Sequence, residues 1–243
     1  MAVTPSAAVV AELAPTGRLR AGINLSNFLL VTGKAANGDP QGIAPDMAGE
    51  IAGRLGVPLQ LLPYANPGKL ADAVAEWDVG LIGAEPARAE QIAFSAAYLE
   101  IESTYLVPPG SKIQSVAEVD RKGVRIAVYG RSAYGLYLSR SIKNAELVNA
   151  EGLDASWELF TKEKLDALAG LRPRLVQDVE RLPGARVLEG RFTAVQQAVG
   201  TPKARTASAA FLAAFVEEAK SAGLVARLIE RHGVRGVNVA PAA

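Results

Sequence analysis

The chain has 243 residues, of which 49% are hydrophobic and 21% charged, the balance of a globular protein with a sizeable core rather than of a disordered chain. Lys and Arg number 26 against 25 for Asp and Glu, so no net charge favours nucleic acid or an anionic membrane surface. The chain has no cysteine, which excludes disulfides, thiol catalysis and zinc–thiolate sites.

The first half of the sequence predicts an alternation of strands and helices. Strands are expected at residues 19–24, 59–63 and 78–83, and helices at 45–55 and 70–77. Asp46 falls in the first turn of the helix at 45–55, where a carboxylate is favoured. Short links between such elements predict mainly parallel sheets covered by helices.

The second half continues the alternation. Strands or extended segments are expected at 100–107, 124–129, 146–149, 165–171, 185–189 and 193–199. Helices are expected at 132–142, around 156–160, at 174–181, at 204–222 and in a short segment up to His232. Gly223 and Gly233 are natural stops for the last two helices.

Two β-rich segments, residues 100–107 and 192–199, have no helix of their own. One interpretation is a single open sheet with two ordinary strands. The other is that both segments cross between two lobes, lobe 1 from residues 1–103 plus 197–243 and lobe 2 from 104–196. Two crossing strands would form a hinge that lets the lobes close around a ligand.

The remaining features narrow the function classes. The lone His232 follows a helix, so it is expected to serve that helix C-terminus rather than catalysis, and no second histidine exists for a His-based metal site. We expect no cofactor and no metal. No run of about 18 apolar residues predicts a membrane span. Residues 1–17 lack the positive start of a secretion signal, which leaves export with a removed signal and a cytoplasmic location both open.

The segment 78–98, DVGLIGAEPARAEQIAFSAAY, carries the most information. It predicts a buried strand, a tight turn at Gly83 and a helix that begins near Pro86, since proline suits the first helical position. Arg88 then lies in the first helical turn, beside free backbone N–H groups. Such a place is suited to holding a small anion.

The chain resembles the bacterial solute-binding proteins of ABC importers, in the amino-acid-binding branch (family 3, type II periplasmic binding fold), from about residue 17 to 233. In that family a strand leads into a Thr-x-x-Arg turn and a Phe-Ser-x-x-Tyr segment, which residues 78–98 resemble. The other matching segments, in the family's order, are GRLRAGIN at 17–24, GIAPDMA at 42–48, RLGV at 54–57, GVRIAVYG at 123–130 and LDALAG at 165–170. The resemblance implies two α/β lobes joined by a two-strand hinge, with a ligand cleft between them.

The resemblance assigns the ligand carboxylate to Arg88, whose planar fork matches a carboxylate bidentately. The alternative is a solvated helix arginine paired with a nearby carboxylate. Glu85 stands where the family has threonine, and the link from the strand is about two residues shorter. Backbone contacts from Gly83 and Ala84 are expected on the same basis.

The loop 130–134 is the second candidate. Ser132 is expected to cap the following helix, which leaves the N–H groups of Ala133 and Tyr134 for an anion; the alternative is a purely structural cap. Gly130 begins this loop, and Arg131 either adds positive charge or faces water.

Three aromatic residues, Phe28, Tyr64 and Tyr129, fall near strand ends and either wall the ligand or pack in the core. The amine-binding Asp of the family is expected five residues after Asp166, where this chain has Leu171 followed by Arg172. A buried ammonium needs a carboxylate or several acceptors. We therefore expect an anionic ligand without a free α-amine, unless Glu85 binds the amine instead.

The leading hypothesis is a monomeric periplasmic solute-binding protein that delivers a small carboxylate or amino-acid-like solute to ABC permease subunits, with no nucleic-acid partner. One alternative is a ligand-sensing module. The other is a dehydratase-type enzyme on the same scaffold with Glu85 as general acid. A neighbouring Arg88 would lower the pKa of that acid, which argues against the enzyme.

Overall fold

The computed structural model describes residues 3–243. The chain folds into two compact units, one from Met1–Glu100 with Gln196–Ala243 and the other from Ile101–Val195. It passes between them in strands β6 (Ile92–Val107) and β11 (Thr193–Pro202), each of which includes a boundary. The predicted α/β class is confirmed. That the units act as lobes around a ligand stays a prediction.

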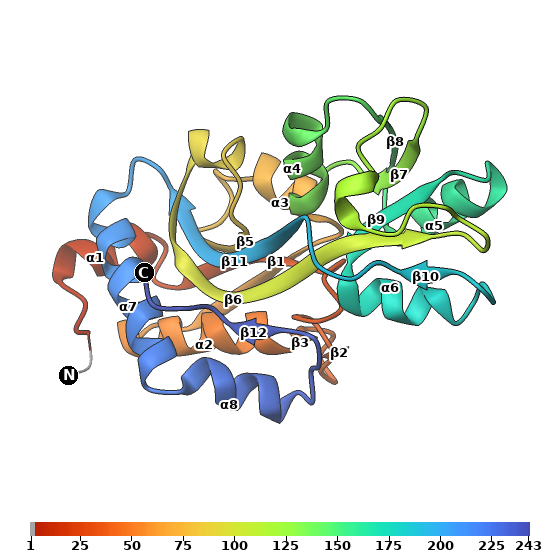
Figure 1. Ribbon diagram of the computed structural model, residues 1–243. Coiled ribbons are helices and arrows are strands. Elements are labelled where there is room, and N and C mark those ends of the chain that lie inside the picture. Colours follow the sequence, from red (N-terminus) through yellow and green to blue (C-terminus); the bar gives the residue numbers. More distant parts are fainter. Residues whose placement is uncertain (1–2) are drawn as a thin grey trace. The chain divides into compact units, whose positions relative to one another are not determined.

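The sheet of the first unit has the order β4 (Leu59–Tyr64), β1 (Leu19–Asn24), β5 (Val79–Gly83) and β11. Strand β1 is parallel to β4 and to β5, whereas β11 is antiparallel to β5. In the view of Figure 1, α2 (Ile43–Leu55) lies below β1 and β5, and α3 (Pro67–Asp72) lies above them. All five residues of β5 are buried, which explains its unbroken apolar sequence.

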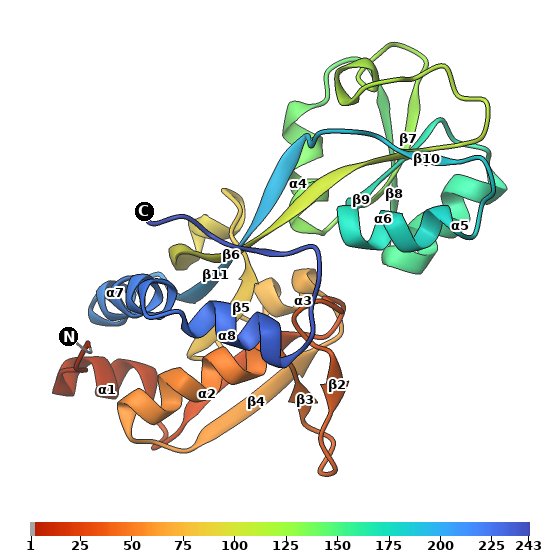
Figure 2. The ribbon, with the colours of Figure 1, turned by 60° about the horizontal axis from the view of Figure 1, so that its bottom comes forward.

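The remaining elements of the first unit cover its sides. Helix α1 (Ala7–Leu13) contacts α7 (Thr206–Ser221), and α8 (Leu224–Arg231) contacts both α7 and α2 (Figure 2). Strands β2 (Gly33–Lys34) and β3 (Pro40–Gln41) form a separate hairpin. Near the C-terminus, β12 (Asn238–Val239) pairs with β6 at Leu99 and Glu100.

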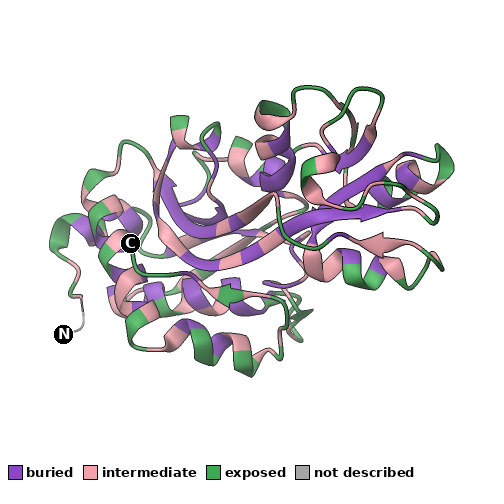
Figure 3. Ribbon diagram, in the orientation of Figure 1, coloured by how far each residue is buried: buried purple, intermediate pink, exposed green. Residues whose placement is uncertain are grey.

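The sheet of the second unit has the order β8 (Glu146–Ala150), β7 (Arg125–Tyr129), β9 (Ala167–Leu171) and the end of β6, with β10 (Arg186–Val187) also paired to β6. Strand β7 is parallel to β8 and β9. Three helices pack on it: α4 (Ala133–Ser141), α5 (Leu153–Lys162) and α6 (Arg172–Val179). Two short 3-10 turns, Arg88–Glu90 in the first unit and Val116–Glu118 in the second, complete the elements. Figure 3 shows that buried residues concentrate along the strands.

Several predicted helices have different bounds in the structure. The helix expected at 70–77 is instead α3, which ends at Asp72, because Trp77 folds back and donates from Nε1 to the carbonyl oxygen of Leu70 at 2.9 Å. The Trp77 ring lies over Gly22 and Gly80, where an added Cβ atom would come within 3.1 Å of it. Fully burying this indole therefore outweighs five more residues of helix, 73–77. Helix α2 begins at Ile43, two residues before the predicted start.

Candidate ligand-binding residues

The first unit brings one set of predicted site residues to a single edge of its sheet. Strands β1, β4 and β5 are parallel and end at Asn24, Tyr64 and Gly83. In open α/β sheets, ligands bind in the crevice outside these carboxyl ends. The turns that follow the three strands therefore form the candidate half-site of the first unit.

Arg88 is held by the turn that follows β5. Its side chain is buried, with the residue 7% exposed, and its Nη1 donates to the carbonyl oxygen of Gly83 at 2.6 Å. The N–H of Ala84 donates to the carbonyl oxygen of Gln196 at 2.7 Å, which fixes the turn against β11. Glu85 is also buried, at 9% exposed. One turn, held by these hydrogen bonds, thus contains Gly83, Ala84, Glu85 and Arg88.

The predicted helix in this segment is wrong. The structure has only a three-residue 3-10 turn, Arg88–Glu90, after which β6 begins at Ile92. Phe94, Ser95 and Tyr98 lie in β6, because that segment pairs with β11 and pairing overrides local helix propensity.

The expected free N–H groups beside Arg88 are not free either. The N–H groups of Arg88 and Ala89 both donate to the carbonyl oxygen of Glu85, at 2.9 and 3.0 Å. The backbone of this turn therefore offers no anion site at these two positions. The guanidinium of Arg88 is the group of the turn with the chemistry to bind an anion.

The two aromatic candidates of the first unit differ in role. Phe28 is half-buried in the turn after β1. Tyr64 packs against the core cluster that contains Leu70 and Trp77, and its hydroxyl donates to Glu76 Oε2 at 2.9 Å. Burial, together with this hydrogen bond, raises the pKa of Tyr64 to about 12. The structure thus favours a packing role for Tyr64.

In the second unit, the loop after β7 has the expected helix cap. Ser132 Oγ accepts from the N–H of Gly135 at 2.9 Å and donates to the carbonyl oxygen of Tyr129 at 2.6 Å. Ala133 and Tyr134 are the first residues of α4, where N–H groups have no acceptor within the helix. Arg131 is exposed, whereas Tyr129, Ser132, Ala133 and Tyr134 are all buried.

Two glycines hold this loop close to its neighbours. A Cβ atom at Gly130 would come within 2.7 Å of Asn149 Oδ1, and one at Gly135 within 2.3 Å of the carbonyl oxygen of Tyr129. Neither position has space for a side chain. The start of α4 therefore lies directly against the carboxyl end of β7.

Leu171 ends β9 at the same edge of the sheet and is 7% exposed. Arg172, which follows it, is paired, because its Nε donates to Glu102 Oε2 at 2.9 Å. The guanidinium of Arg172 also donates to the carbonyl oxygens of Leu188 and Gly190. Arg172 therefore ties the 188–190 loop to the sheet, and its charge is paired.

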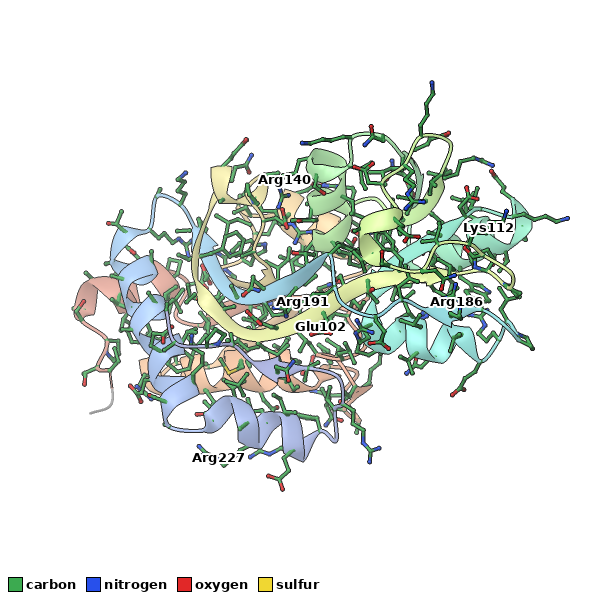
Figure 4. All side chains as sticks on the ribbon, in the orientation of Figure 1. Glu102, Lys112, Arg140, Arg186, Arg191 and Arg227 are labelled. Carbon is green, nitrogen blue, oxygen red and sulfur yellow. The ribbon has the colours of Figure 1, made fainter. Side chains whose placement is uncertain are left out.

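Sequence reasoning missed two features of this edge. Glu102 pairs with Arg172 and lies 3.6 Å from Arg191, beside which it is labelled in Figure 4. Phe192 packs on Tyr105 and on Tyr137, with ring centroids 4.6 and 6.0 Å away. The signal for Glu102 in the sequence was the polar residues at alternate positions of 100–104. That pattern does not identify the partner of Glu102, because the partner residue is distant in sequence.

The other polar clusters serve structure. His232 follows α8, and its Nε2 lies 2.9 Å from Asp46 Oδ2, so it joins a helix end to the first turn of α2. Asp166 accepts from the N–H of Arg125 at 2.8 Å. Within residues 3–243, no group of three or more His, Cys, Asp or Glu side chains could hold a metal ion. No helix in that range is long and apolar enough to cross a membrane.

Several solved structures have a similar fold. The P235GK mutant of ArgBP from T. maritima is 22% identical with a TM-score of 0.72, over 93% of this chain and 99% of that one. A putative ABC-transporter binding component from Wolinella succinogenes, complexed with lysine, is 21% identical with a TM-score of 0.72, over 89% and 95%. The ancestral amino acid-binding protein AncCDT-1, described as a precursor of cyclohexadienyl dehydratase, is 20% identical with a TM-score of 0.71, over 91% and 98%.

At these identities the structural likeness establishes the fold alone. A comparison with curated proteins gives no match. The family model of the bacterial extracellular solute-binding proteins, family 3, matches residues 24–235, which span the segments described above in both units. This chain therefore belongs to the bacterial extracellular solute-binding proteins, family 3.

Proposed function

We propose that this protein captures a small carboxylate-bearing solute in the periplasm and delivers it to the permease subunits of an ABC importer. The carboxylate group of the solute is inferred from the buried guanidinium of Arg88, which donates to the carbonyl oxygen of Gly83 at 2.6 Å. A guanidinium that is already oriented loses little freedom when it binds a carboxylate. Family membership supports the transport role.

The second unit supplies the other half-site of this proposal. The N–H groups of Ala133 and Tyr134 at the start of α4 donate to a second oxygen of the solute, because helix N-termini carry a partial positive charge. Leu171 contributes an apolar contact. The chain joins the two units through β6 and β11, and a solute that uses both half-sites draws the units together on binding.

The proposed solute has no free α-amine. Leu171 offers no charge to an ammonium, and the Glu102 carboxylate is already paired with Arg172. The competing assignment is an amino acid whose ammonium binds Glu85, which is buried in the same turn as Arg88. It has the support of a structural neighbour that is complexed with lysine.

A thermal-shift screen separates the two ligand classes. The standard amino acids are compared with amine-free mono- and dicarboxylates of similar size. A ligand at a hundredfold excess over its Kd stabilises the protein by about 2.7 kcal/mol, a readily measured rise in Tm. If only amino acids raise the Tm, the amine-free assignment is wrong, and Glu85→Gln should then abolish that rise.

Closure of the units has a separate test. Small-angle scattering at proven saturation should give a smaller radius of gyration than the free protein gives. An unchanged profile would contradict ligand-driven closure.

A turnover assay tests the alternative of an enzyme, since Glu85 beside Arg88 is the one pair proposed for acid catalysis. The identified ligand is incubated with the protein and followed by mass spectrometry. Steady conversion of the ligand would overturn the purely binding role.

A further inference from the structure

A pocket of about 270 Å³ lies in the second unit, away from the candidate half-site. It is lined by Phe160 and Leu165, which belong to the core of that unit and are 2% and 1% exposed. Pro108, Pro109 and Leu182 also line it. The pocket therefore opens from the surface directly onto the hydrophobic core.

The strand directions place this pocket at the opposite edge of the sheet from Leu171. Leu165 precedes β9 and Leu171 ends it, so the two positions are roughly 15–20 Å apart at about 3.3 Å per residue. Pro108 directly follows β6, which is antiparallel to β9 and so reaches the same edge as Leu165. The pocket and the solute half-site are thus separate places on one unit.

The polar groups at the pocket are few and specific. The Thr161 hydroxyl donates to the carbonyl oxygens of Trp157 and Glu158 within its own helix, at 3.0 and 3.1 Å. Lys164 is exposed, lines the pocket, and forms no ion pair with any residue of 3–243. The neighbouring charges, Lys162 and Glu163, are paired with Glu158 and Arg125. Lys164 therefore gives the pocket an uncompensated positive charge at its rim.

The backbone holds Lys164 in this position. Helix α5 ends in a left-handed turn in which the N–H of Leu165 donates to the carbonyl oxygen of Phe160 at 3.0 Å. Lys164 occupies the left-handed position, with φ of 51°, where glycine is the usual residue. It is the one non-glycine residue of positive φ within the described part of the chain. Replacing it by glycine removes the charge without disturbing the turn.

We propose that this pocket is a second binding site, for a small amphipathic carboxylate with an aromatic or short aliphatic body. The apolar body fills the space over Phe160 and Leu165, and the carboxylate pairs with the Lys164 ammonium. The volume is sufficient, because an apolar cavity of about 150 Å³ already binds benzene. The site is independent of the solute assignment, since it shares no residue with it.

The probe is phenylacetate, titrated into the full chain to about 10 mM and followed by amide chemical shifts, which detect binding down to millimolar affinity. Shifts are expected at Thr161, Lys164, Leu165 and Leu182. The neutral isostere phenylacetamide should bind about two- to fivefold more weakly, the range of an exposed ion pair. Acetate, which lacks the apolar body, should produce no shifts there.

Two variants and one control complete the test. Lys164→Gly should weaken phenylacetate binding to the level of phenylacetamide, whereas Lys162→Ala, two residues earlier at the end of α5, should not. Leu182→Trp should fill the pocket and abolish the shifts, with an unchanged spectrum elsewhere as evidence of the native fold. Absence of shifts in the wild type, equal shifts in Leu182→Trp, or shifts confined to Ser132 and Leu171 would overturn the proposal. The proposal would also be overturned if the wild type formed a dimer and Leu182→Trp dissociated it, because the pocket would then hold a second copy of the chain.

Discussion

The Arg88 guanidinium donates to the carbonyl oxygen of Gly83, five residues earlier, across the turn that follows β5. This bond links the end of a buried strand to the side chain that is proposed to bind the solute. Because the residue is only 7% exposed, Arg88 belongs to the packed part of the turn and is not a solvated surface arginine.

The first prediction concerns this contact. Arg88→Ala should reduce solute affinity by about ten- to a hundredfold, the range of a lost charged hydrogen-bond pair of about 1.5–3 kcal/mol. It should also lower the free energy of unfolding by about 1–3 kcal/mol, because the buried carbonyl oxygen of Gly83 loses a donor. Calorimetric titration and chemical denaturation measure the two effects.

Arg88→Lys and an unrelated arginine serve as controls. Arg88→Lys should keep the charge but not the bidentate geometry, so affinity should recover only in part. Arg227→Ala, on the exposed side of α8, should change neither quantity. If the Arg88→Ala protein binds within threefold of wild type, Arg88 does not hold the carboxylate.

The second prediction compares two glycines in helices. Gly135→Ala should destabilise the second unit by about 1–3 kcal/mol or more, since its Cβ atom would lie 2.3 Å from the carbonyl oxygen of Tyr129. Gly53→Ala, in the exposed last turn of α2 with no atom within 4 Å, should stabilise the first unit by about 0.5–1 kcal/mol. Thermal and urea denaturation of both variants would measure the two changes in stability. Changes of equal size and the same sign would refute the prediction.

The third prediction concerns the buried carboxylate of Asp78, which is fully inaccessible to solvent. Its oxygens accept from Arg20 Nη2 and Arg205 Nη1, each at 2.8 Å, and from Arg20 Nε at 3.0 Å. Asp78→Ala should lower the free energy of unfolding by about 3–5 kcal/mol, because it leaves two partly buried arginines unpaired. Glu180→Ala, at an exposed position, should stay within about 0.5 kcal/mol of wild type. A loss below about 1 kcal/mol for Asp78→Ala would contradict this role.

The fourth prediction is a pH dependence at Asp120. Partial burial raises the pKa of its carboxyl, but the backbone N–H groups of Ala145, Asn144 and Lys143 outweigh that effect and hold the pKa below its ordinary value. The stabilisation is therefore present above the unfolded pKa near 3.9 and is lost as the pH falls through the lower folded value. Wild type should be more stable than Asp120→Asn above about pH 5, and the difference should shrink below about pH 4. A difference in Tm that stays constant down to about pH 2 would exclude this linkage.

The sequence by itself determined the fold class, most element positions and the family. Buried parallel strands appear as apolar runs, such as 79–83, and helix stops appear as glycines, such as Gly223 and Gly233. Ser132 as the cap of α4 was also visible in the sequence, because a cap depends on residues three positions apart. These features are local, so local chemistry was sufficient to predict them.

Tertiary structure decided the rest, because it depends on pairing between distant residues. The segment after Gly83 became a 3-10 turn and a strand instead of a helix, since β6 pairs with β11, about a hundred residues later in the chain. The Arg172 charge was paired by Glu102, 70 residues away, and Arg88 became buried through its contact with Gly83. No periodicity or spacing in one sequence encodes such long-range partners, because side-chain patterns specify which face is buried and not what it is buried against.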